Sequence, residues 1–128
     1  MADREVTILI CDDEPNLREL MRISLETCPE YRFVEAGDGS EAIQLTESSR
    51  PDLLLLDVMM PGTSGLDVLE HLRARPEHSA TPVVVVSAFA SPADRRRALD
   101  AGATRFLKKP FDPDALRSLV EELLPASA

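Results

Sequence analysis

Val6-Thr7-Ile8-Leu9-Ile10-Cys11-Asp12-Asp13 is a mostly apolar run that ends in two carboxylates. The pattern returns twice, because four leucines at 53–56 lead to Asp57 and four valines at 83–86 lead to Ser87. Runs this short and this apolar are typical of central parallel strands, which are covered on both faces. In an open parallel sheet, ligands bind outside the carboxyl ends of the strands. We therefore expect the polar residues that end these runs to meet at one ligand site.

Strand-like and helix-like patterns alternate along the whole chain. The strand candidates are residues 5–11, 31–36, 52–57, 82–87 and 104–108. The helix candidates are a segment from Pro15 that stops before Pro29, and then residues 39–48, 65–74, 92–101 and 113–124. Ser91 before Pro92 has the form of a helix start, and Ser40 is a candidate cap for the second helix.

Alternating strands and helices predict a parallel sheet with right-handed crossovers. The fold class we predict is α/β and flavodoxin-like, (βα)5, with a five-stranded parallel sheet of order 2-1-3-4-5 and helices on both faces. In that order the first and third strands are neighbours. Asp12 and Asp13 are therefore expected beside Asp57.

Length and composition favour one small globular domain, which we place at residues 1–124, with 125–128 as a tail or the start of a linker. The net charge of −9 argues against direct binding of nucleic acid by this domain. No apolar run approaches the roughly 20 residues of a membrane span. The first residues lack the pattern of a signal peptide, so we expect a cytoplasmic location and no membrane partner.

The cysteines and histidines suggest no metal or redox motif. Cys11 and Cys28 have neither redox nor zinc spacing, so we expect two reduced cysteines. His71 and His78 are interpreted as surface residues.

Three carboxylates, one hydroxyl and one amine at a single sheet edge suit Mg²⁺ and a phosphoryl group. Mg²⁺ prefers oxygen ligands and is often held by one or two carboxylates together with phosphate. A carboxylate can itself be the nucleophile, which gives an aspartyl phosphate. Lys109, after the fifth strand, supplies a point charge for a phosphoryl oxygen, and Ser87 supplies a hydroxyl donor. The candidate catalytic residues are thus Asp57, Ser87 and Lys109.

Each signal has a simpler explanation when it is taken alone. Asp12-Asp13 before Glu14 could be a polar turn, and Ser87 and Lys109 could be a structural hydroxyl and a solvated amine. Arg95-Arg96-Arg97 is most simply a solvated helix face, with partner docking as the alternative. The joint placement at four strand ends is what favours the functional interpretation.

With these residues in that order and spacing, nearly the whole chain resembles the receiver domain of bacterial two-component response regulators. The residues that carry the resemblance are Asp12-Asp13, Asp57 with Met59, Met60, Pro61 and Gly62, then Gly65, Ser87-Ala88, Ala101-Gly102-Ala103 and Lys109-Pro110-Phe111. The resemblance implies a phosphorylation-switched signalling domain of a phosphorelay, and not a turnover enzyme. Its expected partner is a sensor histidine kinase or a phosphotransfer protein, which passes a phosphoryl group to Asp57.

The resemblance also implies a ligand set. Mg²⁺ would be held directly by Asp13 and Asp57, through water by Asp12, and by the backbone carbonyl of Met59. It further implies a cis peptide bond between Lys109 and Pro110.

The conformational switch implied by the resemblance consists of Ser87 and Phe106. Relatives more often have Thr and Tyr at these two positions, so the hydroxyl of the first is kept and that of the second is lost. Apolar Met59 and Phe89 flank the site and cannot orient water by hydrogen bonding, which suggests slow to moderate loss of phosphate. A homodimer through the fourth helix, fifth strand and fifth helix is an expected assembly, whereas the sequence does not identify the output.

Three alternative functions belong to other classes. A flavodoxin-type FMN binder shares the fold, but Asp12, Asp13 and Glu14 would repel its phosphate. A phosphatase with an aspartyl nucleophile would usually have a second acid where Met59 stands. A receiver-shaped scaffold that works without phosphorylation usually lacks an acid or the lysine, and this chain has all of them.

Overall fold

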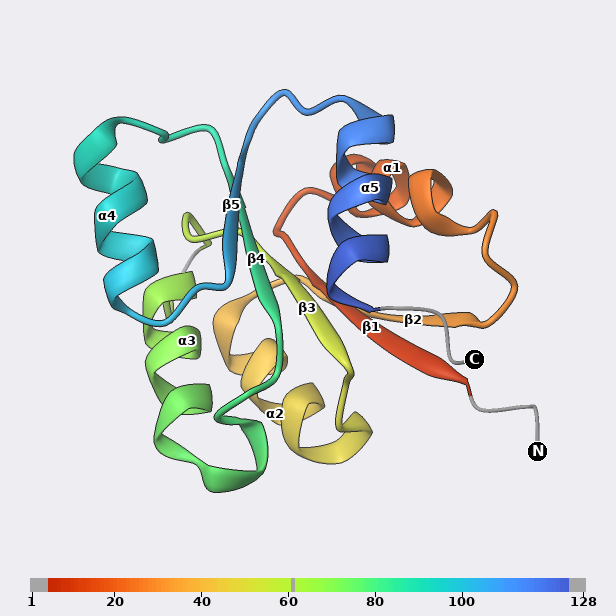
Figure 1. The fold of residues 1–128 in the computed structure, drawn as a ribbon. Helices are drawn as coiled ribbons and strands as arrows, with labels where there is room; N and C mark the ends of the chain where they lie inside the picture. The colour runs from red at the N-terminus through yellow and green to blue at the C-terminus, as the bar shows by residue number, and fades with distance from the viewer. Residues whose placement is uncertain (1–4, 61, 125–128) are drawn as a thin grey trace.

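The computed structural model of the chain describes residues 5–60 and 62–124. Strands and helices alternate through this part of the chain (Figure 1). The strands are β1 (Val6–Cys11), β2 (Tyr31–Ala36), β3 (Leu53–Leu56), β4 (Val83–Ser87) and β5 (Arg105–Lys108). The helices are α1 (Pro15–Leu25), α2 (Gly39–Ser49), α3 (Gly65–Ala74), α4 (Pro92–Asp100) and α5 (Pro113–Leu123), and a short 3₁₀ turn spans Pro76–His78.

The strands form one parallel sheet of order β2-β1-β3-β4-β5, which confirms the predicted topology. β1 and β3 are neighbours, and Cys11 is the register partner of Leu56. Asp12 and Asp57 therefore leave the sheet side by side, each as the first residue after its strand. This register is the structural step that assembles the site.

Helices cover both faces of the sheet (Figure 1). On one face, α2, α3 and α4 pack on a first core cluster that includes Leu9, Leu54, Leu56 and Val85. On the other face, α1 and α5 pack on a second core cluster built on the alternate strand residues. Because β1, β3 and β4 are buried on both faces, a one-residue slip of a strand would exchange two apolar sets of different shape, so burial helps to fix the register.

Two local expectations were wrong. Asp38, not Ser40, caps α2, because the helix already begins at Gly39 and the Asp38 carboxylate accepts a 2.8 Å hydrogen bond from the Glu41 amide. His78 is only 4% exposed, because the 3₁₀ turn folds back under α3, where its backbone carbonyl accepts a 2.9 Å bond from Arg73.

Two further expectations concern the C-terminal tail and membrane-spanning segments. The expected tail, residues 125–128, lies outside the described residues. Among the residues that the structure describes, no helix is long and apolar enough to cross a membrane.

Gly65 allows the start of α3 to lie against the backbone of Asp57 and Val58. A Cβ atom at Gly65 would lie 2.3 Å from the backbone oxygen of Asp57 and 2.5 Å from the Cα atom of Val58. Only a residue without a side chain lets the start of α3 approach the β3–α3 loop this closely.

We expect Gly65→Ala to lower the free energy of unfolding by about 2 kcal/mol, because backbone atoms must move to admit the methyl group. Urea unfolding followed by circular dichroism measures this change. Gly37→Ala is the matched control, since its Cβ atom would meet only the ends of two flexible side chains, Arg18 at 3.4 Å and Glu41 at 3.8 Å. Equal effects of the two substitutions would contradict the close-approach explanation.

Candidate functional site

Three carboxylates converge at the carboxyl ends of β1 and β3. Asp12, Asp13 and Asp57 each offer one oxygen atom, and these atoms all lie within 4.8 Å of one another. Asp12 is fully buried and Asp57 is 4% exposed, whereas Asp13 is exposed to solvent. The sequence-based expectation that these three residues meet is therefore met by the geometry.

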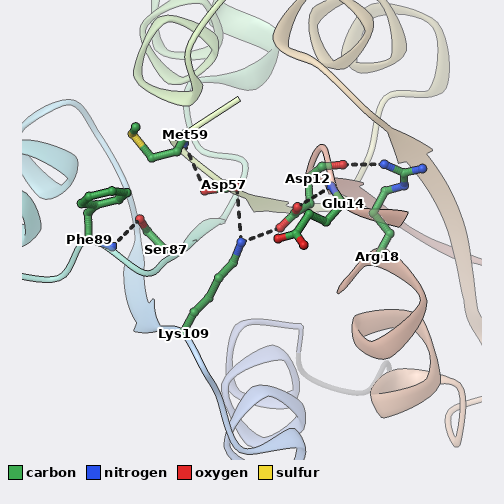
Figure 2. Close-up of polar contacts among 8 residues, drawn as sticks. All are labelled: Asp12, Glu14, Arg18, Asp57, Met59, Ser87, Phe89 and Lys109. Carbon is green, nitrogen blue, oxygen red and sulfur yellow. Dashed lines mark hydrogen bonds and ion pairs between the residues drawn. The ribbon is translucent and has the colours of Figure 1, made fainter. Parts of the chain in front are cut away.

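Lys109 lies between the two buried carboxylates (Figure 2). Its Nζ atom donates to Asp12 Oδ2 at 2.8 Å and to Asp57 Oδ2 at 3.3 Å. The Lys109 amide donates to the carbonyl of Ser87 at 2.9 Å, which holds the end of β5 against β4. The peptide bond between Lys109 and Pro110 is cis, as predicted.

The remaining carboxylate oxygens differ in what they already bind. Asp12 Oδ1 accepts from the Glu14 amide at 2.9 Å, and Asp57 Oδ1 accepts from the Met59 amide at 3.1 Å. Asp13 accepts no hydrogen bond from any residue in the described part of the chain. A hard cation that prefers oxygen ligands, such as Mg²⁺, fits this set of oxygens.

Arg18 is a residue of this site that the sequence pattern did not reveal. Its Nη1 atom donates to the backbone carbonyl of Asp12 at 2.5 Å (Figure 2). Its Nε atom donates to Glu35 at 3.0 Å. The guanidinium therefore holds the backbone between β1 and α1. A signal existed in its position on the first turns of α1, where a long side chain can reach back to the end of β1.

Burial and charge shift two ionisation equilibria at the site. Burial raises the pKa of the Asp57 carboxyl above its usual range, the negative charge of Asp12 adds to this, and the Met59 amide and Lys109 oppose it only in part. Burial alone would lower the pKa of Lys109, but its hydrogen bonds to Asp12 and Asp57 and their charges outweigh burial and raise it. The amine therefore stays protonated and charged.

Ser87 lies near the cluster but is not bonded to it. The side chain is fully buried, and its hydroxyl oxygen accepts a 3.1 Å bond from the Phe89 amide (Figure 2). Within the described residues, no hydrogen bond joins the Ser87 hydroxyl to Asp57 or Lys109. Met59 and Phe89, which are 56% and 54% exposed, add two apolar side chains close to the acids.

Phe106 lies on β5 and packs against the first core cluster. The ring is half-buried, and the guanidinium carbon of Arg95 lies 5.0 Å from its centroid. This arginine–aromatic contact connects α4 with the residue that we expected to take part in a conformational switch.

Comparison with known proteins assigns the family. A family model described as the response regulator receiver domain matches residues 8–121. The chain belongs to the response regulator receiver family. Among curated proteins, this receiver domain is 39% identical over 120 residues to the transcriptional regulatory protein ResD of Bacillus subtilis, covering 94% of the chain and 48% of ResD. It is 37% identical over 124 residues to the cyclic di-GMP phosphodiesterase response regulator RpfG of Xanthomonas campestris, covering 96% of the chain and 33% of RpfG.

Solved structures give the same assignment. A response regulator of Chloroflexus aurantiacus is 30% identical, with a TM-score of 0.87 over 94% of this receiver domain and 98% of that chain. The receiver domain of NarL from Mycobacterium tuberculosis is 32% identical, with a TM-score of 0.86 over 97% and 99% of the two chains. The curated relatives are longer, and the chain spans about half of the length of ResD and a third of that of RpfG.

Family membership and the acidic pocket define the kind of function. The receiver domain is a phospho-accepting signalling domain of two-component systems, a switch and not a turnover enzyme. This assignment disfavours the FMN-binding and phosphatase alternatives.

Neutralising Asp57 is expected to stabilise the metal-free protein. Asp57→Asn should raise the free energy of unfolding at pH 7 by about 1 kcal/mol, because it removes a desolvated charge and keeps an acceptor for the Met59 amide. The folded-state pKa is raised, so the native protein loses stability as pH rises from the unfolded value through the folded value. The gain from Asp57→Asn should therefore shrink towards zero near pH 4.

Urea melts of the metal-free protein between pH 4 and pH 7 measure this gain. Asp13→Asn is the matched control, because the exposed Asp13 side chain should give a change of only about 0.5 kcal/mol or less. A loss of stability in Asp57→Asn at pH 7 would show that the bond to Lys109 outweighs the desolvation of the carboxylate.

Proposed function

We propose that Asp57 is the residue that accepts the phosphoryl group, in a Mg²⁺-dependent transfer from the phosphohistidine of a histidine kinase or phosphotransfer protein. The observation that carries this proposal is the position of Lys109, with Nζ 2.8 Å from Asp12 and 3.3 Å from Asp57. Residues 1–124 would be the functional unit, and a change of its conformation would control an output. The proposed location is cytoplasmic.

The proposed transfer uses a carboxylate that is already oriented. The Met59 amide holds Asp57 Oδ1, which leaves Oδ2 as the attacking atom. Oδ2 forms a bond to phosphorus while the bond from phosphorus to the histidine nitrogen breaks, so the electron pair returns to the imidazole. Lys109 then pairs with an oxygen of the transferred group in place of the carboxylate oxygen.

The acidic residues have different proposed roles in metal binding. Asp13 and Asp57 would hold Mg²⁺ directly with the Met59 carbonyl, and Asp12 through water. The bound ion would neutralise charge on the phosphoryl oxygens. In support, both oxygens of Asp12 already accept hydrogen bonds, whereas Asp13 is exposed and accepts none within the described residues.

We further propose that Ser87 and Phe106 transmit the change. The Ser87 hydroxyl would turn from its contact with the Phe89 amide and donate to a phosphoryl oxygen. Phe106 would move inward into the space that is vacated, and the surface formed by α4 and β5 would change. A homodimer through α4, β5 and α5 is one proposed consequence.

An apolar hollow beside Lys109 supports docking of a kinase or phosphotransfer helix. The cavity has a volume of about 220 Å³. Leu20 is 39% exposed, and Ile23, one turn further along α1, is 48% exposed, so apolar surface continues from the cavity along the helix. The cavity is lined by Leu17, Leu20, Ala88, Lys109, Pro110 and Phe111.

Phosphorylation of Asp57 can be measured directly. Acetyl phosphate with Mg²⁺ should add one phosphoryl group to the chain, and intact-mass spectrometry should find none on Asp57→Asn. Asp100→Asn, an exposed acid on α4, is the matched control and should keep the adduct. An adduct that forms without Mg²⁺ or maps to Ser87 would contradict the assignment, and no adduct at all would favour the phosphorylation-independent scaffold.

The apolar residues beside the site predict the lifetime of the adduct. Phe89→Gln should speed the loss of phosphate by roughly three- to tenfold, because an amide can orient an attacking water and a phenyl ring cannot. The decay of the adduct after removal of the phosphate donor measures this rate. Phe89→Leu should leave the rate near that of the unchanged protein, and equal rates for the Gln and Leu variants would exclude the proposed effect of water orientation.

A further inference from the structure

A second cavity lies at the amino ends of β3 and β4, and we call it the amino-end cavity. Its volume is about 370 Å³, which is within the range of small-molecule sites. It is formed by residues 50–52, which connect α2 to β3, and by residues 76–81, which connect α3 to β4 (Figure 1). Because a strand rises about 3.3 Å per residue, the run from Asp52 to Asp57 separates it from the phosphoryl site by roughly 17 Å. The two sites therefore share no residue.

The imidazole ring of His78 lines the amino-end cavity without a hydrogen-bond partner. His78 is only 4% exposed, and within residues 5–60 and 62–124 its ring forms no hydrogen bond. Its backbone, in contrast, is held firmly, because the amide donates to the Arg75 carbonyl at 3.0 Å and the carbonyl accepts from Arg73 at 2.9 Å. Buried polar groups in folded proteins are normally hydrogen-bonded. The ring nitrogens of His78 are thus available to a ligand.

Two further donors of the cavity are also without partners. Arg50 is exposed, and its guanidinium forms no ion pair or hydrogen bond with any residue in the described part of the chain. The Thr81 hydroxyl likewise forms no hydrogen bond to those residues. The backbone of Arg50 is fixed at the end of α2, where its amide donates to the Thr46 carbonyl at 3.2 Å. A cation, a hydroxyl and an imidazole that all lack partners favour a ligand with negative charge.

The acids of the cavity limit how much negative charge a ligand can carry. The Asp52 carboxylate accepts a 2.8 Å hydrogen bond from the Thr7 amide, and Glu77 Oε2 lies 3.4 Å from Arg75 Nη2. Both acids therefore have protein partners, but their charges remain beside the cavity. Repulsion from fixed charges grows with the charge of the ligand, so a dianion is opposed about twice as strongly as a monoanion.

We propose that the amino-end cavity binds a small organic monocarboxylate with an apolar body about the size of one ring. The carboxylate would accept two parallel hydrogen bonds from the Arg50 guanidinium, which suits a planar carboxylate, and a further one from the His78 ring. The Thr81 hydroxyl would donate to the same group. The apolar body would pack against the remaining lining residues, Pro51, Pro76 and Ala80.

The lining of the cavity is held in place before a ligand binds. Arg73 Nη1 donates to the His78 carbonyl, and Nε and Nη2 of the same guanidinium donate to the Gly102 carbonyl at 3.0 and 2.8 Å. The Thr81 amide donates to the His78 carbonyl at 3.3 Å. A pre-formed site loses little freedom on binding, so even a small probe should bind measurably.

Amide chemical shifts of the full ¹⁵N-labelled chain test the proposal with benzoate as the probe. Benzoate should bind with a dissociation constant of about 1 mM and shift the amides of residues 50, 52 and 77–81. Benzamide, which has the same ring without the charge, should bind about tenfold more weakly, because it lacks the charged hydrogen bonds. Equal binding of the two probes, or shifts centred on Lys109, would overturn the proposal.

Sulfate tests the limit on ligand charge. This dianion has no apolar body and should cause smaller shifts at residues 77–81 than benzoate does at the same concentration. Tighter binding of sulfate would contradict the monocarboxylate assignment.

The ring nitrogens of His78 give a direct measure of contact. The chain contains two histidines, His71 and His78, so each ring can be followed in a long-range ¹H–¹⁵N spectrum. Benzoate should shift the ring nitrogens of His78 and leave those of His71, which faces Glu47 at 3.2 Å, unchanged. A spectrum in which the His78 ring does not respond to saturating benzoate would show that the imidazole is not part of the site.

A substitution at the exposed Arg50 tests the charge without disturbing the core. Arg50→Gln should weaken binding of benzoate by about three- to tenfold, as expected for loss of a charged hydrogen bond. Arg32→Gln, which removes an exposed cation from the edge strand β2, is the matched control and should leave binding unchanged. An equal loss in both variants would indicate unspecific attraction of anions and would refute a defined site.

Discussion

One lysine cation lies between two buried carboxylates at the carboxyl end of the sheet. Lys109 Nζ contacts Asp12 Oδ2 at 2.8 Å and Asp57 Oδ2 at 3.3 Å, and the exposed Asp13 adds a third negative charge. One positive charge does not neutralise three, so the cluster keeps a negative charge that a divalent cation relieves. In our account, metal binding, phosphoryl acceptance at Asp57 and the response of Ser87 all depend on this imbalance.

The fold maintains this arrangement through burial and close approach. β1 and β3 are buried on both faces, so a one-residue slip would exchange two apolar sets that pack against different helices, and Asp12 stays level with Asp57. The start of α3 approaches the backbone of Asp57 because Gly65 has no side chain. The Arg18 guanidinium donates a hydrogen bond to the backbone carbonyl of Asp12 and so orients the end of β1. These contacts let the acids stay close although they repel one another.

The order of the strands and the meeting of Asp12, Asp13 and Asp57 were predictable from the sequence, because apolar runs that end in polar residues identify the ends of parallel strands. The role of Arg18 was missed, since its acceptor is a backbone carbonyl, and only its position on the first turns of α1 indicated that it could reach the end of β1. His78 was taken for a surface residue because nothing in the pattern reveals that the short turn folds under α3. The contact of Arg95 with Phe106 depends on the distance between α4 and β5, which residue spacing alone does not provide.

The central claim is that charge at Asp57 controls the positions of Ser87 and Phe106. A crystal structure of the protein with Mg²⁺ and beryllofluoride tests it most directly. Our account predicts that beryllium is bonded to Asp57 Oδ2, that Ser87 Oγ donates to a fluorine atom, and that the Phe106 ring has moved inward from beneath Arg95. A beryllofluoride complex in which Ser87 still accepts from the Phe89 amide and Phe106 still lies under Arg95 would contradict it.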